Sequence, residues 1–123
     1  MLAKERLGRL ERVLGQLALE DRKIIVEGKH DRDALRELGV TNIVTIERVG
    51  TRIAETLDKD AIVLTDFDRK GRQLAERLRE TLNGSGLNAD MDYRREIKRY
   101  SGITAIEELP SRMEQIRKEI RER

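Results

Sequence analysis

The sequence is notable first for what it lacks: among 123 residues there is no cysteine, one histidine, one proline and three aromatic residues. The absence of cysteine excludes disulfides and thiolate metal sites. With His30 as the single histidine, a thiol or Ser-His triad mechanism has little to work with. Phe67, Tyr93 and Tyr100 are too few for a base-stacking platform, so a nucleic acid would be bound through its phosphates.

Long apolar runs are also missing. No stretch approaches the roughly 20 apolar residues that cross a bilayer, and the first residues, MLAKERLGRLERVL, have no apolar signal core. We therefore expect a cytoplasmic protein with no membrane contact. The phosphate loop Gly-x-x-x-x-Gly-Lys-Ser/Thr and the dinucleotide fingerprint Gly-x-Gly-x-x-Gly are both absent, which argues against P-loop nucleotidases and dinucleotide enzymes.

Charged residues are abundant but nearly balanced. They make up 41% of the chain, with 26 Lys and Arg against 24 Asp and Glu and a net charge of +2. The total charge therefore does not indicate a nucleic-acid binder, although local clusters of one sign can still do so. The apolar residues, 37% of the chain, come in ordered groups, and the length suits one domain with a real core.

The apolar pattern predicts short strands that alternate with helices. We expect strands in RKIIVEG (22–28), NIVTI (42–46), DAIVLTD (60–66) and, with the weakest pattern, LNADMDY (87–93). We expect helices over about 3–19, 30–39, 51–57, 70–82, 94–100 and a last helix from residue 111, where Ser111 and Glu114 form a capping box. This order predicts an α/β fold of about four mainly parallel strands, with helices on both faces.

Acidic residues follow two of these strands at the edge where parallel sheets bind ligands. Glu27 ends the first strand, and Asp66 ends the third, with Asp68 two residues later. If the extended conformation continues through Phe67, both Asp side chains project to the same side. A divalent cation would relieve their repulsion, and hard oxygen ligands favour Mg²⁺ or Mn²⁺.

Each of these features also has a structural interpretation. Asp68 could cap the helix that follows it, Asp66 could be a turn residue, and Asp31 could cap the helix after VEGKHD. His30 is interpreted as an exposed loop residue. The basic side chains beside the acids could line a phosphate path, with Gly28 allowing close backbone approach, or could form a solvated face; they are Lys29, Arg69, Lys70 and Arg72.

IIVEGKHD followed by VLTDFDRKG resembles the Toprim domain, which is shared by topoisomerases, bacterial-type primases, some recombination nucleases and the nuclease that matures 5S ribosomal RNA. The resemblance covers about residues 22–110, within a single Toprim-like domain over 1–123 that has terminal helices in 1–20 and 111–123. The short form is most similar to the small archaeal Toprim proteins and next to the catalytic half of the 5S-rRNA maturation nuclease.

The resemblance implies a role for each matching acid. Glu27 corresponds to the Toprim glutamate, a candidate general acid/base and metal ligand, and Asp66 and Asp68 correspond to the paired aspartates that hold Mg²⁺ or Mn²⁺. GITAIEEL resembles a later segment of the nuclease branch, which makes Glu107 a weaker candidate ligand; an acid near a helix start is the alternative. Topoisomerases usually carry a third acid where this chain has Lys70, so that assignment is disfavoured.

The expected function is therefore a Mg²⁺-dependent phosphodiester-processing protein, a nuclease acting on structured RNA or DNA. Gly28, Lys29, Arg69, Lys70 and Arg72 would contact the backbone phosphates. The alternative is a non-catalytic module that binds nucleic acid or a protein within a larger assembly, with the terminal helices packed on the partner. A third interpretation gives the acids a structural role alone.

Overall fold

The centre of the molecule is a sheet of four parallel strands. The computed structural model describes the backbone of residues 1–122 and the side chains of residues 1–47 and 52–122. The strands are β1 (Ile24–Val26), β2 (Ile43–Thr45), β3 (Ala61–Val63) and β4 (Ala89–Asp90), in the order β2-β1-β3-β4. Every neighbouring pair is parallel. The α/β fold and the four strands, including the weakly patterned fourth, are confirmed.

Helices connect the parallel strands, and connections of this kind are almost always right-handed. They are α1 (Ala3–Ala18), α2 (Lys29–Glu37), α3 (Ile46–Val49), α4 (Arg69–Gly84), α5 (Asp92–Ser101) and α6 (Leu109–Arg121), with the 3₁₀ helices η1 (Gly50–Thr56) and η2 (Ile106–Glu108). Among these helices, none is both long and apolar enough to cross a membrane within the part of the chain that the structure describes.

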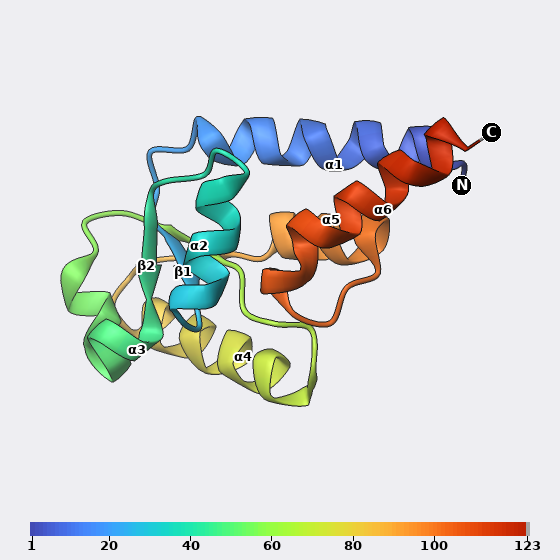
Figure 1. Cartoon of the computed structure of the whole chain (residues 1–123). Coiled ribbons are helices and arrows are strands. Elements are labelled where there is room, and N and C mark those ends of the chain that lie inside the picture. Colours follow the sequence, from blue (N-terminus) through green and yellow to red (C-terminus); the bar gives the residue numbers. More distant parts are fainter. Residues whose placement is uncertain (123) are drawn as a thin grey trace.

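The sheet separates two apolar cores, because successive residues of each strand face opposite sides. On one side, Ile24 and Ile62 pack with the apolar residues of α1, α2, α5 and α6. On the other side, Ile25 and Val63 pack with Ile53 of η1 and with the buried face of α4. Figure 1 shows α1, α5 and α6 on one side and α4 on the other. The terminal helices α1 and α6 thus cover one face of the sheet.

Three helices start earlier than predicted by two residues or more, and one of them is α5, which begins at Asp92 instead of residue 94. The last helix begins at Leu109, so Ser111 lies inside its first turn and the predicted Ser111–Glu114 capping box is wrong. Pro110 favours this earlier start, because it lacks an N–H and the first helical turn does not need one. The helix predicted over 51–57 is the 3₁₀ helix η1. It continues directly from α3, so helical structure in this segment begins at Ile46.

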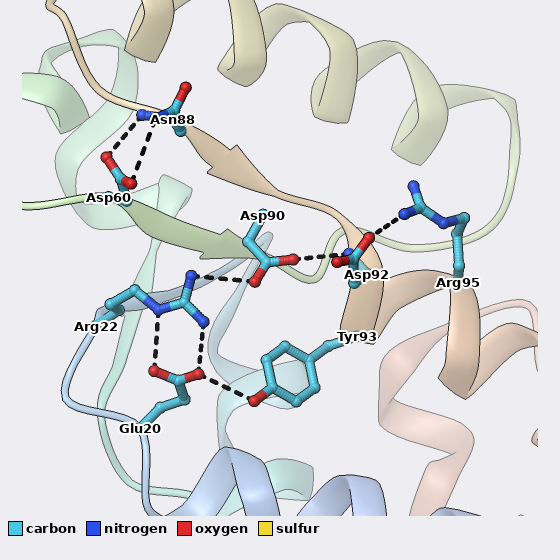
Figure 2. A network of polar contacts seen from close by, with 8 residues as sticks. All are labelled: Glu20, Arg22, Asp60, Asn88, Asp90, Asp92, Tyr93 and Arg95. Atoms are coloured by element: carbon cyan, nitrogen blue, oxygen red, sulfur yellow. Dashed lines mark hydrogen bonds and ion pairs between the residues drawn. The ribbon is translucent and has the colours of Figure 1, made fainter.

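A polar network fixes α5 to the segment between α1 and β1 (Figure 2). Arg22 donates to Glu20 at 2.9 and 2.5 Å and forms an ion pair with Asp90 at 3.0 Å. The hydroxyl of Tyr93 donates to the same Glu20 carboxylate at 2.9 Å. Asp90 also accepts from the Asp92 N–H at the start of α5. The end of β4 and the first turn of α5 are therefore held by the side chains of Glu20 and Arg22, which lie in the N-terminal part of the chain.

The start of α4 lies unusually close to the end of β3, and Gly71 makes this possible. The Gly71 N–H donates to Asp68 Oδ1 at 2.7 Å, and its carbonyl accepts from the buried Thr65 hydroxyl at 2.7 Å. A Cβ at this position would lie 1.9 Å from the carbonyl oxygen of Asp66. Any other residue would therefore push α4 away from the Asp66 backbone.

We expect Gly71→Ala to lower the free energy of unfolding by about 3 kcal/mol, the upper end of typical overpacking costs, because the clash is with backbone rather than a flexible side chain. Urea unfolding monitored by circular dichroism measures this. Gly84→Ala is the matched control at the end of the same helix, where no atom lies within 4 Å of the added methyl. It should leave stability unchanged or raise it by up to about 1 kcal/mol; equal effects of the two changes would contradict the close-approach argument.

Candidate functional site at the carboxyl edge of the sheet

The carboxyl ends of β1, β2 and β3 open into a hollow of about 410 Å³. Most of its polar lining is acidic, with one Lys and the single His. The lining residues are Glu27, Gly28, His30, Asp31, Ile46, Glu47, Asp66, Lys70, Leu74 and Glu107. The hollow therefore lies at the edge where open parallel sheets bind their ligands.

Glu27 and Asp66, the strand-end acids of β1 and β3, are in direct contact. The backbone N–H of Asp66 donates to Glu27 Oε2 at 2.7 Å, across 39 residues of sequence. This bond fixes the Glu27 carboxylate beside the end of β3, next to the Asp66 side chain. The sequence prediction that the two motifs meet at one sheet edge is confirmed in its geometry.

Asp66 is also bound from two other elements. Its Oδ1 accepts from the backbone N–H of Ile106, the first residue of η2, at 2.8 Å. Its carbonyl oxygen accepts from Arg94 Nη2 at 2.6 Å, while Arg94 Nε donates to the Thr65 carbonyl at 3.0 Å. The Asp66 carboxylate therefore has a fixed position, with its second oxygen accepting no hydrogen bond from the described side chains and backbone.

The environment of Asp66 favours its protonated form. Burial raises its pKa from 3.8 to about 7, and the negative charges of Asp31, Glu27 and Asp68 add to the rise, while the bond from the Ile106 N–H acts against it. A carboxyl group that is costly to ionise among other acids is a group that a bound cation would stabilise in its charged form.

Asp31 is the third acid near this centre, and it takes part in capping α2 without being the N-cap residue. The residue that caps α2 is Gly28, and Asp31 lies in the first turn, where Oδ2 accepts from the Gly28 N–H at 3.3 Å. Asp31 is only 7% exposed. Burial raises its pKa, and Glu27 and Glu107 add to the rise, against the bond from Gly28.

Asp68 takes the capping role that the sequence left open. It is the N-cap of α4, and its Oδ1 accepts from the Gly71 N–H. Asp68 is not among the residues that line the hollow, although its charge contributes to the raised pKa of Asp66. The two aspartates of the motif therefore do different work: Asp66 lines the hollow, and Asp68 starts the helix beside it.

The other predicted site residues divide between the hollow and its surroundings. Gly28, Lys70 and Glu107 line it, whereas Lys29, Arg69 and Arg72 do not. His30 was interpreted as a loop residue, but it is an exposed residue of α2 that lines the hollow.

Two further acids and one arginine at this edge were not expected as site residues. Asp31 was assigned to a cap, and Glu47 was not singled out, although it follows β2 just as Glu27 follows β1. The Glu47 carboxylate lies against Gly28, 2.8 Å from where a Cβ would stand. An acid follows each of the first three strands, and this pattern could have been recognised in the sequence. No sequence pattern indicated Arg94, which reaches the site from α5.

The acids of this hollow offer carboxylate oxygens, the donors that Mg²⁺ prefers. Within residues 1–47 and 52–122, no three Asp, Glu or His side chains already converge as a closed metal cage. Glu27 and Asp66 each use one oxygen in a hydrogen bond from backbone, so each keeps a second oxygen. Mg²⁺ commonly binds through one or two carboxylates together with waters and substrate phosphates, and the pair fits that form of site.

Comparison with known proteins assigns the chain to a family. It is 40% identical to a UPF0292 protein of Thermococcus sibiricus over 85% of this chain and 88% of the relative. The chain belongs to the UPF0292 family. Other members are 38% identical in Pyrococcus horikoshii, over 87% of this chain and 86% of the relative, and 40% identical in Methanocaldococcus jannaschii, over 76% and 80%. These organisms are archaea, which agrees with the expected archaeal type.

Comparison with solved structures gives the same fold in another organism. A protein of Aquifex aeolicus superposes with a TM-score of 0.68 at 25% identity, over 85% of this chain and 95% of that one. A comparison with models of known protein families finds no match. The three family members named above match this chain over 76% to 87% of its length.

We expect the stability of the metal-free protein to fall as pH rises from about 4 to about 7. In this interval folded Asp66 keeps a proton that the unfolded chain has lost, since its pKa is raised from 3.8 to about 7, so unfolding releases a proton and higher pH favours it. Urea unfolding in EDTA across this range measures the slope. Asp66→Asn should reduce the slope, with the remainder due to Asp31 and other groups; parallel curves would contradict the raised pKa.

Proposed function

We propose that the chain is a Mg²⁺-dependent phosphodiester-processing protein of the Toprim type, a nuclease that acts on structured RNA or DNA in the cytoplasm. The single observation that carries the proposal is the 2.7 Å contact between the Glu27 carboxylate and the Asp66 N–H. It joins the two strand-end motifs whose sequences resemble the Toprim signature. Mn²⁺ is the alternative ion, since it accepts the same oxygen ligands.

The carboxylates would have separate tasks in this reaction. Asp66 and Glu27 would hold the ion through the oxygens that backbone N–H groups leave free. When bound, the ion would polarise the phosphate and stabilise negative charge on the attacking or leaving oxygen. Glu27 would also move the proton of the reacting oxygen. Lys70, the basic residue that lines the hollow, would contact the phosphate itself.

The remaining predicted residues would act around this centre. Asp68, which caps α4 through Oδ1, would add charge to the ion site, and Glu107, which lines the hollow, would be a weaker ligand. Lys29, Arg69 and Arg72 are exposed and would contact phosphates farther along the strand, with Gly28 allowing close approach at the start of α2.

We expect purified protein to cleave a panel of hairpin RNA and duplex DNA substrates when Mg²⁺ is present and to stop when EDTA is added. Glu27→Gln should reduce the rate at least about 100-fold, as loss of a general acid/base does. Product formation on denaturing gels measures this. Asp33→Asn, an exposed acid on α2 away from the hollow, is the control and should keep full activity. Cleavage by Glu27→Gln at the wild-type rate would refute the proposal.

Asp68→Asn separates capping from metal binding, because Asn caps helices as well as Asp but carries no charge. If Asp68 contributes to the ion site, Mg²⁺ affinity should fall by about tenfold while thermal stability stays the same. Isothermal titration and thermal melting measure the two quantities. An unchanged affinity would confine the ion to Glu27 and Asp66 and leave Asp68 as a cap alone.

The second candidate is a non-catalytic module that binds nucleic acid or a protein in a larger assembly. The observation in its favour is that the described acids do not form a closed metal cage and that one acid of the motif is used as a helix cap. This function predicts binding of nucleic acid, or copurification with a larger complex, without measurable Mg²⁺ affinity or cleavage.

A further inference from the structure

A second hollow is lined by Phe67, the residue that follows Asp66. Its volume is about 400 Å³, and its described lining has no acid: the residues are Phe67, Arg72, Arg94, Arg95, Lys98 and Arg99. We refer to it as the Phe67 hollow. It differs in charge from the acidic hollow at the next residue, which is lined by Glu27, Asp31, Glu47, Asp66 and Glu107 with Lys70 as its only Lys or Arg among the described residues.

The positive charges of the Phe67 hollow are mostly not neutralised by acids. Arg94 bonds to the carbonyls of Thr65 and Asp66, and Arg72 Nη1 donates to the Phe67 carbonyl at 3.0 Å. Lys98 Nζ donates to the Ile103 carbonyl at 2.9 Å. These acceptors are neutral, so the bonds fix the side chains and leave their charge. Arg95 differs, since it pairs with Asp92 on the exposed surface.

The basic side chains of this hollow lie close enough to act on one another. Burial lowers the pKa of Arg94, and the nearby positive charge of Arg72 lowers it further. Elsewhere on the described surface, basic residues commonly stand beside acids, as Arg79 beside Glu76 and Lys59 beside Asp21 do. A hollow lined by several basic side chains and by no acid, as this one is, is the arrangement expected of a surface that receives an anion.

The aromatic ring in this hollow does not offer a stacking surface. Phe67 is 7% exposed, and its ring is covered by Arg94 at 5.0 Å and Lys98 at 5.6 Å from its centroid. Both contacts are cation–π interactions that hold the two basic side chains over the ring. A nucleobase therefore has no free face to stack on, and the ligand that fits is an anion such as phosphate.

The basic residues stand on a helix that is fixed at its start. Arg94 and Lys98, like Arg95 and Arg99, are four residues apart on α5 and so lie on successive turns. The network of Glu20, Arg22, Asp90 and Tyr93 holds the first turn of α5 in place (Figure 2). The charges are therefore presented with little loss of backbone freedom on binding.

We propose that the Phe67 hollow binds backbone phosphates of the nucleic acid whose reacting phosphate lies in the acidic hollow. The inference rests on the proposed function and adds the residues that would hold the substrate. The acidic hollow repels a phosphate, so attraction must come from neighbouring cations. Arg94 is in contact with both sides, since it lines the Phe67 hollow and binds the carbonyl of Asp66 at 2.6 Å.

The test measures binding of a fluorescent RNA hairpin and a DNA duplex by anisotropy in EDTA, over a range of salt concentrations. Arg95→Gln with Arg99→Gln should weaken binding at least about tenfold at low salt. The slope of log affinity against log salt should become shallower by about 0.7 to 0.9 for each phosphate that the variant no longer neutralises. Both residues are exposed, so folding should be preserved, and Arg99→Gln alone provides a second variant with a smaller effect of the same kind.

The matched control removes two exposed charges elsewhere, with Arg36→Gln on α2 and Lys118→Gln on α6. This variant has the same net charge as the double variant on α5, and it should bind almost as the wild type does. Equal weakening by the two double variants would overturn the inference, since it would show an effect of total charge. Displacement of the RNA by polyglutamate at equal charge concentration would also overturn it, in favour of an acidic protein partner.

The outcomes separate this inference from the proposed function, because the binding assay needs neither Mg²⁺ nor cleavage. Salt-dependent binding through Arg95 and Arg99 in a protein that never cleaves would support the inference and refute the nuclease proposal. Mg²⁺-dependent cleavage that does not change in the Arg95→Gln, Arg99→Gln variant at low substrate concentration would refute the inference and leave the nuclease proposal standing.

Discussion

The hydrogen bonds around Asp66 join the elements on which the whole site depends. Its N–H donates to Glu27 beyond β1, its carboxylate accepts from η2, and its carbonyl accepts from Arg94 of α5. The same carbonyl leaves no room for a Cβ at Gly71 and so brings α4 close. Four elements thus meet at one residue, and a displacement there would move the acidic hollow and the Phe67 hollow together.

The parts of the fold that follow from local pattern could be predicted from the sequence. Apolar runs marked β1 and β3 because both strands are fully buried, and their acids then had to meet, since parallel strands end at one edge. The helix starts were less predictable. Ser111 and Glu114 match a capping box, yet Pro110 and the buried Leu109 draw the start of α6 forward. A local signal fails when burial of neighbouring residues determines where the helix begins.

The composition of the site was only partly predictable for a related reason. Spacing predicted Asp66 and Asp68 on one side of an extended segment, but the chain bends at Phe67 and Asp68, and Asp68 does not line the hollow. The first N–H groups of α4 need an acceptor, and Asp68 provides it as the N-cap. Arg94 could not be anticipated at all, because its contact with Asp66 spans 28 residues and belongs to no motif.

The two hollows at the Asp66–Phe67 segment carry opposite charge. Asp66 lines the acidic hollow and Phe67, the next residue, lines the basic one, so one peptide separates the two. Burial raises the pKa of Asp66, and the charges of Asp31, Glu27 and Asp68 add to the rise. Burial lowers the pKa of Arg94, whereas the charges of Glu27, Asp66 and Asp68 raise it. The acids thus act on Arg94 across the segment, while Asp66 itself is costly to ionise. A cation on one side and phosphates on the other would satisfy both at once, and a nucleic-acid backbone that crosses this edge with a divalent ion brings both.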